Sequence, residues 1–285
     1  MLTRWNKPWA AGSRARHYPA MWRSTASGSA TAQAPGTHLL AAFSARLQGV
    51  VGQLRVDPGA NEITAALKPP KTLPLNGVTI TGDAMFTQKA ICKAIIDGGG
   101  NYFFTVKGNQ PALQADIARA FRPFSPPRRY GLLKATETIE KSHGRIETRR
   151  LEATSTLAEY LRPLWSGVAQ VCRITRERIV RGKKTIETVY AITSLTAGRA
   201  GTEQLLALSR ARWGIENCLH YVRDVSCREG QVCTHAGHAP QVLAACRNTA
   251  LTLIRRLGYK VVEGFEHFAE HRLAAVQAVR GPRTE

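Results

Sequence analysis

One acidic residue stands directly behind the clearest strand-like segment of the chain. Residues 77–81 read GVTIT, a β-branched run typical of a buried strand, and Asp83 follows it through a glycine. Ligands of α/β folds bind at the carboxyl ends of strands, so a carboxylate at this point is placed to hold a metal ion. The alternative role for a lone acid after a strand is to cap the next helix.

A second group of reactive side chains lies on a predicted helix at residues 203–225, around the string RARWGIEN at residues 210–217. Helical spacing puts Arg212, Glu216 and His220 four residues apart on one face, with Arg223 about one turn further along. A carboxylate there can complete a metal site while the cations contact phosphate. The simpler alternative is an intrahelical ion pair between Arg212 and Glu216, which stabilises by only about a few tenths of a kcal/mol.

Polar residues also end the next predicted strand, which reads NYFFTVK at residues 101–107. Lys107, Asn109 and Gln110 fall at this end, where their side chains can contact the backbone phosphates or the base edges of DNA. The same residues equally fit a polar turn between a strand and a helix.

The charge of the chain favours a polyanionic partner. Among 285 residues, 40 are Lys or Arg and 20 are Asp or Glu, a formal charge of +20 that is spread over the whole length. Neutralising phosphates releases counterions and strengthens binding, so nucleic acid is the expected partner, with a merely solvated basic surface as the alternative. The sequence contains no run of about 18 apolar residues, so it does not predict a membrane span. Its six cysteines have no paired spacing, which favours reduced thiols in a cytoplasmic protein.

The elements that must position these residues follow from hydrophobic periodicity. Strands at 77–81 and 101–107 alternate with helices at 87–97 and 111–121, which predicts a partly parallel sheet covered by helices. The remaining predicted elements are a hairpin at 38–44 and 49–56, a short helix at 61–67, strands near 145–153, 167–176 and 185–195, and long helices at 203–225 and 240–257.

Four strings, in this order and spacing, resemble one family. GDAMFTQKAI, NYFFTVKGNQPAL, HGRIETRR and RWGIENCLHYVRDV are similar to the ISAs-type, H-repeat-associated branch of the DDE insertion-sequence transposases, from about Thr37 to Leu257. The resemblance implies an α/β fold, namely an RNase H-like mixed sheet flanked by helices, with a β-strand insertion before the last catalytic helix. It also implies chemistry with two Mg²⁺ (or Mn²⁺) ions.

The resemblance assigns roles to individual residues. Asp83 matches the second catalytic aspartate and Glu216 the catalytic glutamate, and both are expected to hold metal. Arg212 matches the arginine of a Tyr-Arg-Glu-Lys signature, whose tyrosine position is Ser209 here and whose lysine position is Arg223. The predicted DNA-binding residues are Lys107, Asn109, Gln110, His143, Arg145, Arg149, Arg210, Arg212, Trp213, Asn217, His220 and Arg223, those of the HGRIETR string having a DNA-facing or structural role.

The first aspartate of the family has no counterpart in the sequence. It belongs on the opening strand, yet the chain contains no Asp or Glu before Asp57. Residues 1–36 are therefore expected to be disordered or non-homologous, as in a truncated or frame-shifted copy, with the opening strand missing from the sheet. Asp57 and Glu62 are expected to lie too far from the central strand to replace the absent carboxylate.

These observations predict five segments and one function. The segments are residues 1–36, a first part of the catalytic domain at 37–122, a β-rich insertion at 123–200, C-terminal helices of the catalytic domain at 201–260 and a basic tail at 261–285. The expected function is DNA transposition for a bacterial insertion sequence, by metal-dependent cleavage and transfer of DNA strands, impaired by the missing aspartate. The alternative is a non-catalytic DNA-binding remnant. Expected partners are double-stranded DNA, as terminal inverted repeats and target, and a second copy in a synaptic complex, at the nucleoid in the bacterial cytoplasm.

Overall fold

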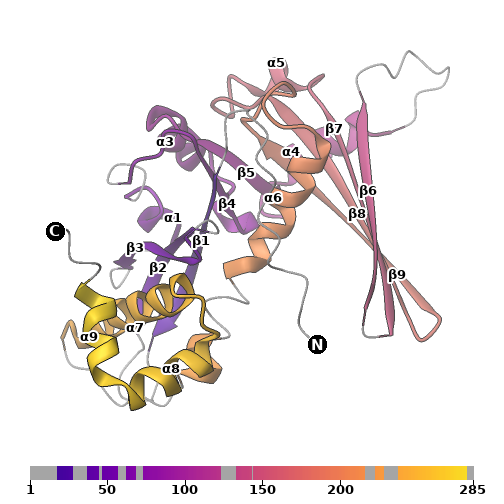
Figure 1. The fold of residues 1–285 in the computed structure, drawn as a ribbon. Helices are drawn as coiled ribbons and strands as arrows, with labels where there is room; N and C mark the ends of the chain where they lie inside the picture. Colours follow the sequence, from indigo (N-terminus) through magenta and orange to yellow (C-terminus); the bar gives the residue numbers. More distant parts are fainter. Residues whose placement is uncertain are drawn as a thin grey trace, which may run out of the picture.

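A computed structural model shows a mixed sheet with helices on both faces (Figure 1). The structure describes residues 18–27, 37–44, 47–56, 62–68, 73–122, 133–142, 144–215, 222–227 and 237–280. Nine strands among these residues form one sheet in the order β3-β2-β1-β4-β5-β9-β8-β7-β6.

The first five strands form the part of the sheet that carries Asp83. They are β1 (Tyr18–Ser27), β2 (Thr37–Ser44), β3 (Gly49–Arg55), β4 (Val78–Gly82) and β5 (Asn101–Val106). β1, β4 and β5 are parallel, whereas β2 and β3 run antiparallel to them. The prediction of an RNase H-like mixed sheet flanked by helices is confirmed.

The opening strand is present, so the expectation that it is missing is wrong. β1 lies between β2 and β4, and Trp22 is opposite both Ala42 and Gly82. Its sequence YPAMWRSTAS shows no alternation of apolar and polar residues, which is why the local pattern did not predict a strand. β1 is a strand because β2 and β4 pair with its backbone hydrogen-bonding groups on both sides. This pairing depends on residues outside the segment, so the local sequence does not predict it.

Alternating residues of the sheet pack against different helices. Ile80 and Phe104 point to the face covered by α3 (Lys89–Asp97) and α4 (Pro111–Ala120), where Ile91, Ile95 and Ile117 are fully buried with them. On the other face Phe103 packs with leucines of α6 (Thr202–Ile215), and Ala41 and Phe43 pack with Leu251 of α7 (Ala239–Arg256). The fold therefore has helix, sheet and helix layers, and α6 and α7 share one face.

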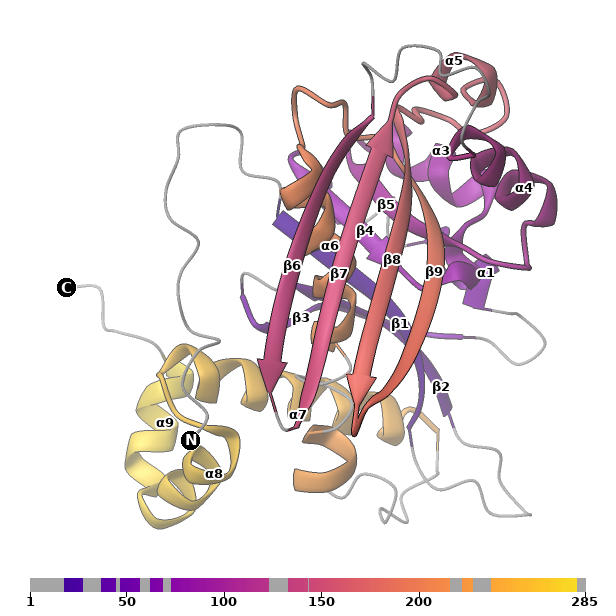
Figure 2. The ribbon, with the colours of Figure 1, turned by 90° about the vertical axis from the view of Figure 1, so that its right-hand side faces the viewer.

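The predicted insertion contains four strands instead of three. They are β6 (Lys134–Ser142), β7 (Arg145–Thr154), β8 (Gln170–Val180) and β9 (Lys183–Thr193), followed along the ribbon in Figure 2. β9 pairs antiparallel with β5, so the insertion continues the main sheet. The segment KATETIEKS of β6 is polar and lies at the sheet edge, which explains why hydrophobic periodicity did not predict it.

The C-terminal part is helical beyond α7. In place of an expected basic tail from residue 261, the chain forms α8 (Val261–Glu270) and α9 (Arg272–Arg280). Tyr259 stacks on His267 with ring centroids 4.9 Å apart and contacts Phe268 edge-on, so aromatic packing holds α8 against the end of α7. Among the described residues, no helix is both long enough and apolar enough to cross a membrane.

Candidate active site

Asp83 lies at the carboxyl end of β4, as predicted. Its backbone is extended, with φ −66° and ψ 164°, and the 3-10 turn η1 (Ala84–Phe86) follows it. The Asp83 side chain is half-buried and makes no capping hydrogen bond to that turn, so the capping alternative is not supported. By alternation from Ile80, Asp83 belongs to the face of the sheet that α6 covers.

Two residues predicted to contact DNA instead hold the loop behind Asp83. The Asn109 side-chain amide donates a hydrogen bond to the carbonyl oxygen of Ala84 at 2.6 Å, and the Gln110 side-chain amide donates one to that of Thr87 at 2.9 Å. These hydrogen bonds are those of a polar turn, while Lys107 beside them is exposed, and DNA contact by the three residues stays a prediction.

Helix α6 crosses the sheet at the level of Asp83. Ala211 packs against the cluster formed by Ala41, Phe43 and Leu251. Ala41 is the register partner of Arg23, and Arg23 follows the residue opposite Gly82, so Ala41 and Asp83 lie at the same height on the sheet. Helix α6 therefore passes the level of Asp83 at Ala211, four residues before it ends at Ile215.

Several predicted site residues fall outside the described part of the chain. These residues are His143, Glu216, Asn217 and His220, whereas only the backbone is described for Arg212, Trp213 and Arg223. Residue 216 directly follows α6, whose path across the sheet is known. The convergence of Asp83 and Glu216 thus stays a prediction.

The described residues do not fit a two-metal site. β1 carries no carboxylate along its length, and the residue level with Asp83 on this strand is Arg23. Within the described ranges no three His, Cys, Asp or Glu side chains gather in a way that could hold a metal ion. Glu62 begins α1 (Glu62–Ala65), which packs through Ala65 on the α3 face, opposite α6, so it does not replace the missing ligand; Asp57 lies outside the described residues.

The HGRIETR string places a buried carboxylate among arginines. The side chain of Glu147 is 2% exposed and forms ion pairs with Arg149 at 2.7 Å, with Arg145 at 3.8 Å and with Arg176. Arg149 also pairs with Glu140 of β6 at 3.0 Å. Arg145 and Arg149, both predicted to bind DNA, thus have a structural role inside the insertion, and their contact with DNA stays a prediction.

Acid is expected to weaken the insertion through these carboxylates. Burial alone would raise the pKa of Glu147, but the hydrogen bond from Arg176 and the charges of Arg149, Arg176 and Arg145 outweigh it and hold the pKa below its ordinary 4.5. Arg149 and Arg210 lower the pKa of Glu140 in the same way, against the effect of burial. A depressed pKa stabilises the fold above the unfolded pKa, so the free energy of unfolding should fall as the pH drops through about 4.5 and below. Denaturant titrations from pH 7 to pH 3 measure this, and a Glu147→Gln protein with the same pH dependence as the parent would contradict it.

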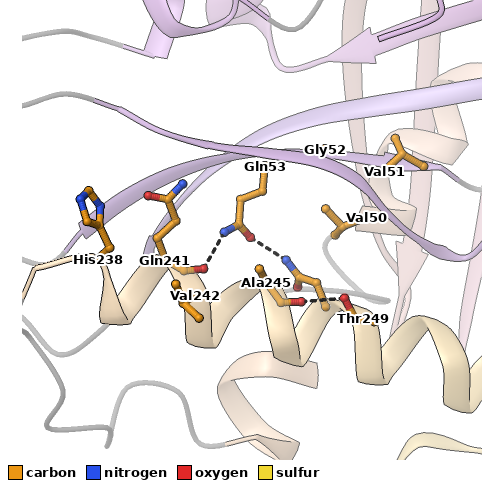
Figure 3. A pocket seen from close by; sticks show the side chains of 10 residues that line it. Val50, Val51, Gly52, Gln53, His238, Gln241, Val242, Ala245 and Thr249 are labelled. Carbon is orange, nitrogen blue, oxygen red and sulfur yellow. Dashed lines mark hydrogen bonds between the residues drawn. The ribbon is translucent and has the colours of Figure 1, made fainter. Parts of the chain in front are cut away.

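A groove of about 520 Å³ lies between β3 and α7, three strands away from β4 (Figure 3). The Gln53 side chain donates a hydrogen bond to the carbonyl oxygen of Gln241 at 3.2 Å and accepts one from the Asn248 amide at 2.7 Å. These contacts fasten the edge strand to the helix, and the groove contains no residue of the predicted site.

The family model described as "Transposase DDE domain" matches residues 12–253. The match begins within residues 1–36, upstream of the resemblance seen in the sequence motifs. It therefore includes β1.

The chain is also similar to several individual proteins and to one solved structure. A protein from Xanthobacter autotrophicus, named "Uncharacterized protein in dhlA 3'region", is 37% identical over 162 residues, which are 56% of this chain and 54% of that protein. The "H repeat-associated putative transposase YhhI" of Escherichia coli K12 is 30% identical over 228 residues, 76% of this chain and 58% of the relative. The chain thus spans little more than half the length of these relatives. The piggyBac transposase synaptic complex with hairpin DNA is similar with a TM-score of 0.46 and 11% identity, over 90% of this chain and 51% of that one. Because the family model matches most of the length of this chain, the chain belongs to the DDE transposase family.

Proposed function

We propose that this chain binds DNA as a bacterial insertion-sequence transposase does and that its own metal-dependent strand cleavage is impaired. The observation that carries the proposal is the composition of the central strand. β1 runs parallel to β4 and brings Arg23, not a carboxylate, to the height of Asp83.

DNA binding is supported by the charge of the chain and by one exposed lysine near Asp83. The formal charge of +20 favours phosphate contacts along the whole chain. Lys107 is exposed at the carboxyl end of β5, next to the Asp83 loop, and is proposed to contact phosphate. For Arg212, Trp213, Asn217, His220 and Arg223, DNA contact is proposed from the family resemblance alone.

Metal binding is proposed to be weak. Mg²⁺ or Mn²⁺, when bound in pairs, activates the attacking oxygen and stabilises the leaving one in phosphoryl transfer. Asp83 and Glu216 are the proposed remaining ligands, and two carboxylates are too few to hold a pair of ions.

The proposed partners follow from this function. They are double-stranded DNA, as the terminal inverted repeats and the target of the element, and a second copy of the chain in a synaptic complex at the nucleoid.

A binding and nicking experiment tests the proposal. The purified chain is incubated with a duplex that carries the terminal repeat flanking its own gene and with an RNA of equal length. We expect tighter binding to the duplex, with an affinity that falls steeply as salt rises, and no nicking with Mg²⁺ or Mn²⁺.

Asp83→Ala is the control variant for this experiment. If the parent chain nicks the duplex in a metal-dependent way and Asp83→Ala does not, the impairment is refuted and the chain is an active transposase. Preference for RNA over the duplex would refute the DNA-binding function itself.

A further inference from the structure

Helix α6 is held unequally along its length. Leu205, Leu206 and Leu208 are buried against the sheet in its first half, at most 8% exposed. Arg210 and Ala211, in the second half, are only partly buried. Among the described side chains of this second half, Arg210 makes a polar contact with the insertion.

One acidic side chain of the insertion provides such a contact. Glu140 on β6 forms two ion pairs. Its Oε1 atom lies 2.5 Å from Nη2 of Arg210, and its Oε2 atom lies 3.0 Å from Nη1 of Arg149. Both carboxylate oxygens are thus engaged by different elements. Arg149 in turn pairs with the buried Glu147 at 2.7 Å, so the chain of charges runs from the helix into the interior of the insertion.

This contact lies close to the C-terminal end of α6, which precedes the predicted catalytic glutamate in the sequence. Arg210 precedes Ile215, the last residue of α6, by five residues, roughly 7.5 Å along the helix axis. A side chain that is 42% exposed, as Glu140 is, contributes little to global stability through an ion pair. Its effect should instead be local, on the direction and order of the last turns of α6.

We infer that Glu140 is a positioning residue, which fixes the last turns of α6 against the insertion and thereby sets where this helix ends, directly before Glu216 in the sequence. Only the importance of residue 216 rests on the proposed function. The link between α6 and β6 stands on the contacts themselves, which explains how the insertion can act on the site while lying beside it.

Amide hydrogen exchange of the free protein tests the inference without DNA or metal. In Glu140→Gln, amides of residues 209–215 should exchange about fivefold faster at unchanged melting temperature, while amides of residues 203–208 stay as protected as in the parent. Glu177→Gln is the matched control, since Glu177 pairs with Lys184 at 2.8 Å between β8 and β9, away from α6. This control should leave all of α6 unchanged.

A second variant separates positioning from a general loss of structure. Arg210→Gln should speed exchange of the same amides, and the double variant Glu140→Gln/Arg210→Gln should add nothing to the larger single effect, because one contact is removed in each case. Glu140→Asp, which keeps the charge, should restore part of the protection. Unchanged exchange in both single variants, or an equal effect in Glu177→Gln, would overturn the inference. Neither result would bear on DNA binding, which is measured separately.

Discussion

Deletion of residues 1–36 is expected to abolish cooperative folding of the chain. The deletion removes β1 from the middle of the sheet, so β2 and β4 lose their hydrogen-bonding partner on one side. Leu39, Leu40 and Ile80, each at most 2% exposed, would lose cover on these two strands. Re-exposing such side chains costs about 1.5–3 kcal/mol each, so three of them remove a large part of a typical stability of about 5–15 kcal/mol.

Thermal and denaturant unfolding followed by circular dichroism would measure the effect. The control is deletion of residues 1–11, which lie upstream of the family match and leave β1 intact. We expect the control to melt like the parent, whereas the longer deletion should be insoluble or unfold without a sharp transition. A sharp transition at the parent temperature after the longer deletion would mean that residues 18–27 are dispensable, as the sequence pattern suggested.

The sequence predicted best those elements whose pattern is local. The strands ending at Gly82 and Val106 and the helices that follow them combine β-branched or aromatic runs with helical periodicity, and all were found near their predicted bounds. β1 and β6 were missed for a common reason. Neither shows a regular alternation of apolar and polar residues, and each is a strand because a neighbour offers it a hydrogen-bonding edge, which depends on residues far away in the sequence.

The candidate site shows the same division. The place of Asp83 followed from one strand and was found, but the partners of polar and basic residues could not be predicted. Asn109 and Arg149 look from sequence like DNA contacts, yet one holds a backbone carbonyl and the other two carboxylates. Arg210 pairs with Glu140, which lies 70 residues away in the sequence, so only the folded chain reveals this contact.

Replacement of Arg23 by aspartate is expected to strengthen divalent metal binding far beyond that of the parent. The β1–β4 register puts residue 23 next to Asp83, on a strand about 4.8 Å away. Two carboxylates at this separation can converge on one ion with oxygen distances of about 2.1 Å. The substitution also changes the local charge by two units. At about 5 Å from a divalent ion, even with the dielectric constant of water, this favours binding by roughly 3 kcal/mol, or about a hundredfold.

Two further variants show whether this gain comes from shared ligation beside Asp83. Titration calorimetry with Mn²⁺ should find binding in Arg23→Asp and little in Arg23→Asn, which removes the cation but supplies no carboxylate. The gain should disappear in the double variant Arg23→Asp/Asp83→Asn, because a lone carboxylate at residue 23 lacks its neighbour. Binding that survives in the double variant would place the ion elsewhere. No binding in Arg23→Asp, in a protein that unfolds like the parent, would mean that residues 23 and 83 do not share a site, and the absence of a carboxylate on β1 would then not explain an impaired enzyme.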